Sequence, residues 1–314
     1  MKFNVCKMNF RFRARFGHTG YELENTTDYI SSDRLFSAIF IEWKEIYGLE
    51  DATKTLIDNE FKVSNAFPYV SDTLYFPRPR LNITREDLSN DFYDNNRKKI
   101  KALTYLTKTS LENLIAGKRL GKEAVETEIK AYSKLKKSIT TDLPQKVAIK
   151  ISEDNKLFRV KEMYFNKDSG LYFIYEIKSE FTEKFKKVLK SLGITGIGSD
   201  RSTGAGCFEI DFSQITVNNE FEAKRYYTLS EVIPTVEEIE KIKEQIGQTG
   251  YGLVKKGGRV HEKGTFKVPG YAFSAGSVFP ININGKIDTF ENNIYTHKVY
   301  RYGKTINLAI KGGI

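Results

Sequence analysis

The sequence predicts an α+β protein with antiparallel sheets, and three observations lead to this prediction. The chain has 314 residues, a length typical of about two domains. Aromatic residues make up 13% of it, which favours strands. The elements read from residues 1–217 follow the order β-α-β-β-α-β, with one helical insertion at residues 84–145. We therefore expect a ferredoxin-like (RRM-like) domain at residues 1–217 and a smaller, degenerate ferredoxin-like domain at residues 218–314.

The first strand is expected at residues 3–16, where apolar residues alternate with arginines towards the end. Arg11, Arg13 and Arg15 fall on one face of it. Such charges are usually solvated, but three arginines on one face repel each other unless an anion neutralises them. A helix follows at residues 34–47, with Ser32 or Asp33 as its N-cap.

The middle of the chain contributes short strands at residues 61–63 and 74–76, followed by the stiff Pro77-Arg78-Pro79-Arg80 segment, which presents two arginines. The charged residues 84–145 form the helical insertion, which either packs on the sheet or contacts RNA or protein. Aromatic-rich runs at residues 157–163 and 171–177 surround an Asp/Gly turn and predict a hairpin.

A glycine-rich loop lies between an amphipathic helix at residues 181–192 and a strand at residues 207–215, and it reads GITGIGSDRSTGAG. Glycines let a backbone approach a bulky anion closely, and free N–H groups in such a turn can bind it. Arg201 adds a planar donor fork that suits phosphate. We expect this loop to contact phosphate, although a plain turn between helix and strand is the alternative.

Two nucleotide-binding motifs are excluded for this loop. A P-loop requires a lysine after the glycines and a strand before them, and here a helix comes first. A dinucleotide fingerprint requires a third glycine where this chain has Arg201. The sequence therefore favours neither nucleotide hydrolysis nor NAD binding.

The second half begins after a linker at residues 218–220. We expect strands at residues 224–229, from residue 250, and at residues 295–302 and 305–310, with a helix at residues 234–246. A basic glycine turn, KKGGR, starts at Lys255, and a glycine-hydroxyl stretch follows at residues 270–279.

Composition limits the function further. The formal charge is +10 and the pI about 9.2, which favours an anionic partner such as nucleic acid. Cys6 and Cys207, and three widely spaced histidines, form no disulfide or metal motif. We expect no metal, no cofactor, no signal peptide and no membrane span, and hence a cytoplasmic protein.

The motifs resemble those of a known family. A ferredoxin-like domain with G-x-G-x-D-R-S-x-G-x-G-x-F before its last strand resembles the RAMP superfamily of CRISPR proteins. The helix start SDRLFSAI from Ser32 and the late stretch GYAFSAGSVF from Gly270 narrow the resemblance to the fourth Csm subunit of type III-A effector complexes, a Cas-five-like group. Nearly the whole chain takes part, and one difference is Arg34, where we expect threonine.

This resemblance implies a non-catalytic subunit that binds the 5′ repeat-derived handle of the crRNA. It also implies two protein partners, the large polymerase-like Cas subunit and the Csm backbone subunit (the third Csm subunit), and no small-molecule substrate. The implied RNA contacts are Gly196, Gly198, Ser199, Asp200, Arg201, Ser202, Thr203, Gly204 and Gly206 of the glycine loop, Ser32, Asp33 and Arg34 of the helix start, and Gly276 and Ser277 of the late stretch. By residue type and loop position alone, further candidates are Tyr21, Arg78, Arg80, Lys255, Lys256 and Arg259.

Two alternative functions stay open. The first is a metal-independent repeat endoribonuclease of the Cas-six kind, in which His18 would act as general base, although an ordinary turn histidine is favoured there. The second is a generic RRM-type RNA-binding module. It ranks last, because TGAGCFEI at residues 203–210 lacks the basic residue and the first aromatic residue of that motif.

Overall fold

The computed structural model describes residues 1–17, 23–81, 88–148, 156–258, 260, 267–290 and 298–311. The helices are α1 (Ser32–Tyr47), α2 (Leu49–Thr53), α3 (Asn90–Ala102), α4 (Lys108–Ile115), α5 (Lys122–Ser138), α6 (Thr182–Thr195) and α7 (Val236–Glu244). Short helical turns are η1 (Lys54–Asp58), η3 (Ser179–Phe181), η4 (Arg201–Thr203) and η5 (Ile246–Gln248).

The strands of the first part are β1 (Lys2–Phe10), β2 (Lys62–Val63), β3 (Phe67–Val70), β4 (Thr73–Pro77), β5 (Tyr105–Thr107), β6 (Ile139–Asp142), β7 (Gln145–Ala148), β8 (Lys156–Arg159), β9 (Glu162–Phe165), β10 (Ser169–Glu176) and β11 (Phe208–Thr216). Those of the second part are β12 (Arg225–Thr228), β13 (Leu253–Lys256), β14 (Gly270–Phe273), β15 (Val278–Phe279), β16 (Ile287–Phe290), β17 (Val299–Tyr302) and β18 (Asn307–Ile310).

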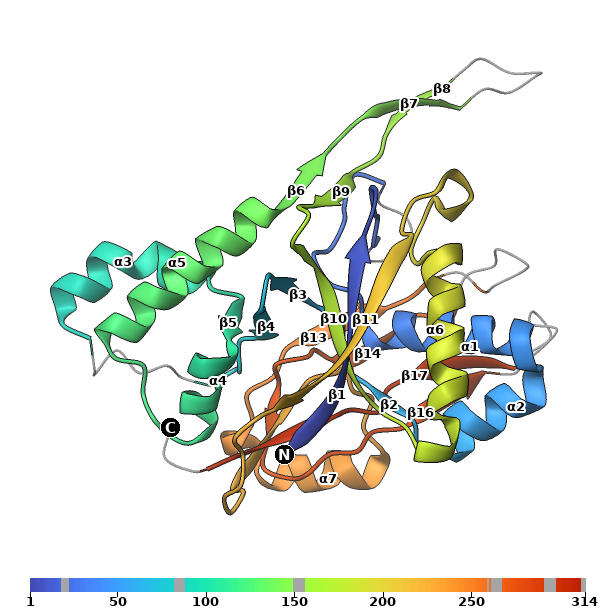
Figure 1. Cartoon of the computed structure of the whole chain (residues 1–314). Coiled ribbons are helices and arrows are strands. Elements are labelled where there is room, and N and C mark those ends of the chain that lie inside the picture. The colour runs from blue at the N-terminus through green and yellow to red at the C-terminus, as the bar shows by residue number, and fades with distance from the viewer. Residues whose placement is uncertain are drawn as a thin grey trace.

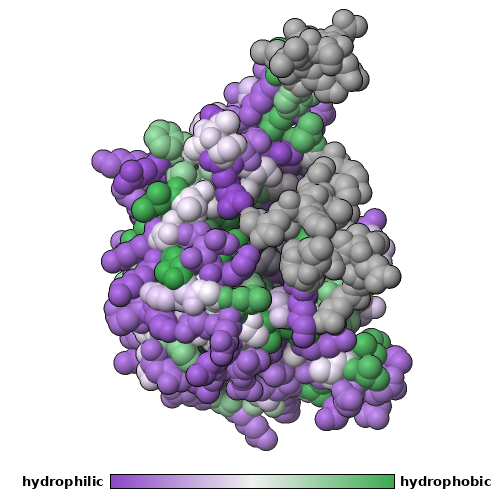
Figure 2. Space-filling model, turned by 90° about the vertical axis from the view of Figure 1, so that its right-hand side faces the viewer, coloured by the Kyte–Doolittle hydropathy of each residue, from purple (hydrophilic) through white to green (hydrophobic). Residues whose placement is uncertain are grey.

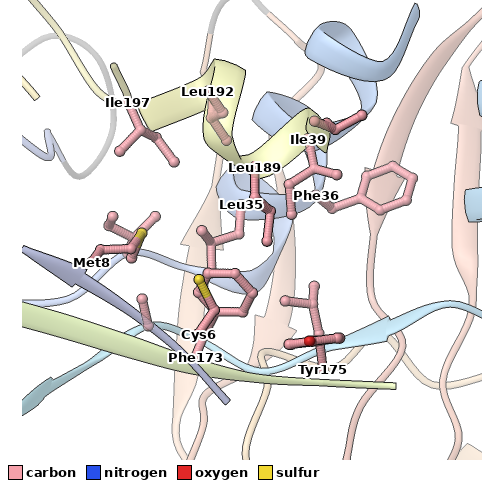
Figure 3. Close-up of a cluster of buried hydrophobic side chains, with 14 of the residues drawn as sticks. Cys6, Met8, Leu35, Phe36, Ile39, Phe173, Tyr175, Leu189, Leu192 and Ile197 are labelled. Carbon is pink, nitrogen blue, oxygen red and sulfur yellow. The ribbon is translucent and has the colours of Figure 1, made fainter. Parts of the chain in front are cut away.

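A seven-stranded sheet in the order β11-β1-β10-β3-β4-β5 forms the centre of the molecule, and β2 also pairs with β10. The strand pairings of the described residues are antiparallel, as expected. Helices α1 and α6 cover one face of the sheet (Figure 1). Figure 3 shows side chains of both helices meeting those of β1 and β10, among them Leu35, Leu189, Met8 and Phe173.

The first strand is shorter than expected. β1 ends at Phe10, and Phe12 is 65% exposed instead of facing the core. The partner strand β11 begins opposite Phe10, and the chain before it is the turn of the glycine loop. Beyond Phe10, β1 therefore has no extended neighbour on that side. The three arginines of this stretch lie in different surroundings, because Arg11 pairs with Glu209, Arg13 pairs with Glu162 and Arg15 is buried.

Helix α1 starts two residues earlier than expected, at Ser32. Its N-cap is Ser31, whose hydroxyl accepts a hydrogen bond from the N–H of Arg34. The expectation that Ser32 or Asp33 caps the helix was wrong, because both side chains are buried and bind the second half of the chain. The helix ends at Tyr47, before Gly48 with φ +86°.

The predicted hairpin around residues 166–170 was wrong. The first run divides into β8, which pairs with β7, and β9, which pairs with β6. The second run, β10, pairs with β1 and β3 in the central sheet. β10 is buried along nearly its whole length, so its backbone N–H and C=O groups need hydrogen-bonding strands at both edges. β7 and β8 form an arm that projects from the body above β6 and β9 (Figure 1).

Within the helical insertion, the pattern of residues 122–137 predicts a helix that is confirmed as α5. A second helix, expected around residues 97–106, is observed as α3 over Asn90–Ala102, and the end of the expected range belongs to β5 instead. With α4, these two helices enclose a small apolar core of Leu88, Ile100, Leu106, Leu114, Leu120 and Val125. Strand β5, between α3 and α4, joins the edge of the central sheet through β4. This attachment ties the helical segment directly to the sheet.

Residues after 217 form three small sheets, β15-β12-β18, β13-β14 and β16-β17. Tyr227 and Leu308 of this part share a buried cluster with Val5 and Tyr172 of the central sheet. Its helix α7 begins with a capping box between Thr235 and Glu238. The division into two ferredoxin-like domains stays a prediction.

The surface is mostly polar. On the side of the molecule that carries α1, α2 and α6, hydrophilic residues predominate and hydrophobic ones gather only in small groups (Figure 2). None of the helices in the described part is long and apolar enough to cross a membrane.

Candidate nucleic-acid interface

A pocket of about 480 Å³ lies where three distant segments meet. Its walls come from the glycine loop between α6 and β11, from the start of α1 with the chain before it, and from the end of β13 with the turn that follows. Six basic side chains and two acidic ones line it: Arg15, Arg34, Arg201, Lys255, Lys256 and Lys267, with Asp33 and Glu231. Positive charge therefore exceeds negative charge by four among the described lining residues.

The glycines of the loop allow its backbone to pack tightly. Gly198 has φ +102°, and a Cβ there would lie 2.4 Å from the carbonyl oxygen of Arg15. Gly206 has φ +76°, and a Cβ there would lie 2.0 Å from the carbonyl oxygen of Ile197. The turn Arg201–Thr203 stands between two left-handed residues, Asp200 and Gly204. These glycines are thus required by the fold of the loop itself.

Most amides of the loop are engaged within the protein. The N–H groups of Gly196, Ile197, Ser199, Thr203, Gly204, Ala205 and Gly206 donate to carbonyl oxygens. Within the described part of the chain, the N–H groups of Gly198, Asp200, Arg201 and Ser202 have no such acceptor. Three of these four are consecutive, and they are the amides that could bind an anion.

The charged side chains of the loop differ in their contacts. Arg201 is exposed, and no described residue forms an ion pair with it. Asp200 lies 3.6 Å from the Nζ of Lys146 on β7, and the hydroxyl of Thr203 accepts a hydrogen bond of 2.9 Å from Arg13. The arm and the segment that follows β1 therefore hold the loop in place, and they leave Arg201 available to a ligand.

At the start of α1, two of the predicted contacts serve to join the halves of the chain. The N–H of Ser32 donates to Oδ1 of Asn65 at 2.8 Å, and its hydroxyl accepts from the N–H of Glu231 at 3.2 Å. Asp33 accepts from the N–H of Tyr302 at 2.8 Å, and its Oδ2 lies 3.7 Å from Nζ of Lys256. Both residues are buried.

Asp33, Glu231 and Lys256 form a buried cluster, which we call the ionic junction. Lys256 forms an ion pair with Glu231 as well as with Asp33. Burial alone pushes the pKa of Asp33 up, but Lys256, Lys267 and the Tyr302 N–H outweigh it, so the pKa lies below its ordinary value. Asp33 is therefore ionised at neutral pH. Because Lys256 balances its charge, Asp33 repels an anion less than an unpaired carboxylate would.

The remaining basic residues of the pocket vary in exposure. The half-buried Arg34 donates to the carbonyl oxygen of Gly17, and burial lowers the pKa of its guanidinium. Lys267 donates to the carbonyl oxygen of Tyr300 at 3.0 Å, and burial lowers its pKa while Asp33 partly offsets this. Lys255 is exposed. Arg201 and Lys255 are thus the cations of the rim.

Four other predicted residues lie together outside this pocket. Arg78 donates to the carbonyl oxygen of Ile100 at 2.8 Å, at the end of α3. The N–H of Arg80 donates to the carbonyl oxygen of Gly276 at 2.9 Å. The hydroxyl of Ser277 donates to the carbonyl oxygen of Ser274 at 2.7 Å. Only Arg80 has an exposed side chain among them, since Ser277 is buried and Arg78 is half-buried.

Some candidates cannot be placed. His18, Tyr21 and Arg259 lie outside the described residues. In the described part, no group of three or more His, Cys, Asp or Glu side chains could hold a metal ion.

Among the titratable side chains of the pocket wall, sequence reasoning missed Tyr29, Glu231 and Lys267. Burial raises the pKa of Tyr29, and the charge of Glu231 adds to this. The arginine run pointed to Arg15 as a residue in need of an anion. No local pattern marks Glu231 or Lys267, because their place depends on pairing between distant segments.

Comparison with known proteins agrees with the resemblance seen in the motifs. A family profile described as the CRISPR Csm4 C-terminal domain matches residues 221–310. The CRISPR system Cms protein Csm4 of Thermococcus onnurineus (strain NA1) is 27% identical over 292 residues, covering 89% of this chain and 91% of that protein. The protein of the same name from Streptococcus thermophilus is 25% identical over 320 residues, covering 98% of each.

The chain is therefore similar to Csm4 proteins of CRISPR systems along nearly its whole length. Two solved structures have the same fold as this chain. A chain in the crystal structure of a Csm3-Csm4 subcomplex of the type III-A CRISPR-Cas interference complex matches with a TM-score of 0.69 at 20% identity, covering 99% of this chain and 100% of that one. A chain in the Csm1-Csm4 cassette in complex with pppApA matches with a TM-score of 0.67 at 19% identity, covering 99% and 98%.

Proposed function

We propose that this chain is a Csm4 protein, a non-catalytic subunit of a type III-A Csm interference complex. In this proposal it binds the 5′ repeat-derived handle of the crRNA and links the large polymerase-like Cas subunit to the Csm backbone. The observation that carries the proposal is the pocket in which the glycine loop, the start of α1 and the end of β13 meet. These are three of the segments that the sequence motifs single out.

The chemistry of the pocket suits a phosphate backbone. The excess of basic side chains attracts an anion, and the free amides of the loop offer donors at close range. Arg201 and Lys255 stand on the rim, where a phosphate can reach them without displacing another partner. Single-stranded RNA is bound through such backbone contacts together with splayed bases.

The predicted site residues divide by role in this proposal. Gly198, Ser199, Arg201, Ser202 and Lys255 contact the RNA directly. Ser32, Asp33 and Lys256 form the wall behind it, and Gly196, Gly204 and Gly206 give the loop its shape. Arg34 and Asp200 orient the chain around the pocket, as does Thr203. Arg80 contacts the RNA only if the RNA strand extends past β14.

The two protein partners are proposed from the solved relatives. Structures with the same fold come from a Csm3-Csm4 subcomplex and a Csm1-Csm4 cassette. We infer equivalent neighbours for this chain. Co-expression with the Csm1-type and Csm3-type subunits of the same organism, followed by pull-down through a tag on this chain, tests this; failure to recover either subunit would contradict it.

RNA binding is tested by changing Arg201 to Ala. The full chain is titrated against a labelled single-stranded repeat RNA at several salt concentrations. Loss of one phosphate contact should weaken binding and lower the slope of log K against log salt by about 0.7. Lys187→Ala, which removes an exposed cation on α6, is the control and should leave both quantities unchanged.

If Arg201→Ala and the parent chain bind the RNA with identical affinity at every salt concentration, the proposed site is contradicted. The same RNA incubated with the protein in EDTA should remain intact. Cleavage that disappears in His18→Ala would instead favour the endoribonuclease.

A further inference from the structure

The two-stranded sheet β13-β14 has two unlike faces. Its register places Leu253 opposite Phe273, Val254 opposite Ala272 and Lys255 opposite Tyr271. Side chains alternate between the faces of a strand, and directly opposed residues share a face. Ala272 and Lys256 therefore point inward, where both are buried. Leu253, Lys255, Tyr271 and Phe273 point the other way, and with Tyr251 we call them the outer face.

The outer face exposes large apolar side chains. Tyr271 is 66% exposed, Leu253 60% and Tyr251 47%. Phe273 is more covered, because its ring meets Tyr251 at 5.2 Å and Phe279 at 5.0 Å between ring centroids. Isolated exposed apolar residues are ordinary on a protein surface, but here they gather on one face of one small sheet.

The outer face is continuous with the pocket. Lys255 belongs to both, since it lines the pocket and stands opposite Tyr271. Opposed residues of an antiparallel pair have Cβ atoms about 5 Å apart. A cation and an aromatic ring at that spacing match the phosphate and the base of one nucleotide, which are joined through a single sugar. Lys255 is also the one charged residue among the five that define this face.

We infer that the outer face carries the RNA strand onward from the pocket, with a base stacked on the ring of Tyr271 and the adjoining phosphate held by Lys255. The inference deepens the proposed function and rests on it. Basic side chains that follow a backbone, combined with aromatic rings that stack bases, are the common means of holding single-stranded nucleic acid. Every base has a π face, so Tyr271 secures the strand without selecting its sequence.

The test measures RNA affinity of the full chain by fluorescence anisotropy, with a single-stranded RNA of the organism's own CRISPR repeat. Tyr271→Ala should weaken binding about tenfold, in line with the loss of one stacked base. Tyr271→Phe keeps the ring and should bind within about twofold of the parent chain. Stacking involves no ion release, so Tyr271→Ala should leave the salt slope unchanged, whereas Lys255→Ala should lower it.

Two controls separate stacking from other effects. Val236→Ala truncates a comparably exposed apolar side chain, 68% exposed at the start of α7, and should not change the affinity. RNAs with a single abasic nucleotide, placed at each position in turn, locate the stacked base. At one position the abasic RNA should bind weakly to the parent chain, and there Tyr271→Ala should cause no further loss.

The possible failures are distinguishable. If the parent chain binds the RNA and Arg201→Ala weakens it while Tyr271→Ala does not, this inference is overturned and the proposed function stands. Equal losses in Tyr271→Ala and Tyr271→Phe would overturn stacking in favour of a hydroxyl contact. Unchanged RNA affinity together with lost binding of the Csm1-type or Csm3-type subunit would make the outer face a protein-docking surface. A parent chain that binds no RNA would overturn the proposed function and the inference together.

Discussion

Lys255 and Lys256 are neighbours in the sequence, yet they belong to opposite regions of one pocket. Lys256 lies in the ionic junction, buried between Asp33 and Glu231. Lys255 lies on the rim, exposed and beside the glycine loop that carries Arg201. The strand alternation of β13 sends one lysine inward and the other outward. A basic pocket therefore contains charges that hold the protein together and charges that remain available to a ligand, and composition alone does not distinguish them.

The largest expected effect comes from removing the lysine of the junction. Lys256→Met leaves the carboxylates of Asp33 and Glu231 buried without their cation, which should cost about 3–5 kcal/mol of unfolding free energy. Lys255→Met is the matched variant and should change it by less than about 0.5 kcal/mol. Urea unfolding followed by circular dichroism measures both. Equal stabilities of the two variants would remove the distinction between junction and rim.

A smaller effect is expected from the glycines of the loop. Gly198→Ala forces a side chain into a left-handed backbone and against the Arg15 carbonyl, and should cost about 3 kcal/mol. Gly204→Ala has a similar φ of +79° but meets no atom within 4 Å, so it should cost only about 1 kcal/mol. Thermal unfolding ranks the two variants. A greater loss in Gly204→Ala would contradict the loop geometry described above.

The smallest effect concerns acid. The pKa of Asp33 is lowered in the folded state, so its contribution to stability is present above its ordinary pKa of about 4 and is lost as the pH falls through the folded value. Asp33→Asn removes this contribution at all pH values. The stability of the parent chain should therefore fall more steeply below about pH 4 than that of the variant. Parallel curves of unfolding free energy against pH would show that Asp33 does not titrate as expected.

Local pattern was enough to predict several elements. The apolar spacing of α1 and α6, and Pro234 near the first turn of the helix expected at residues 234–246, gave helices close to those observed. The glycine loop was recognisable because its composition is unusual and its neighbours are a helix and a strand. Helix periodicity and turn chemistry are properties of neighbouring residues, so a single sequence contains them.

Pairing between distant segments was not predictable in the same way. The turn before β10 indicated a hairpin, but β10 pairs with β1 and β3, which supply hydrogen-bond partners to its buried backbone at both edges. Ser32 and Asp33 were expected to cap α1 and to contact RNA. In the structure their side chains accept hydrogen bonds from the N–H groups of Glu231 and Tyr302. Nothing near residue 33 in the sequence indicates a bond to a residue 269 positions away.

That separation has a consequence for the synthesis of the protein. The Ser32–Glu231 and Asp33–Tyr302 bonds join the first helix to residues that leave the ribosome 199 and 269 positions later. The helix and the glycine loop emerge earlier, but the pocket between them lacks a wall until β13, the turn that follows it and Lys267 have been made. Contacts so far apart form late and slowly in folding. A nascent chain thus has no finished pocket, and under the proposed function guide RNA binds only molecules whose synthesis has run past the segments that complete it.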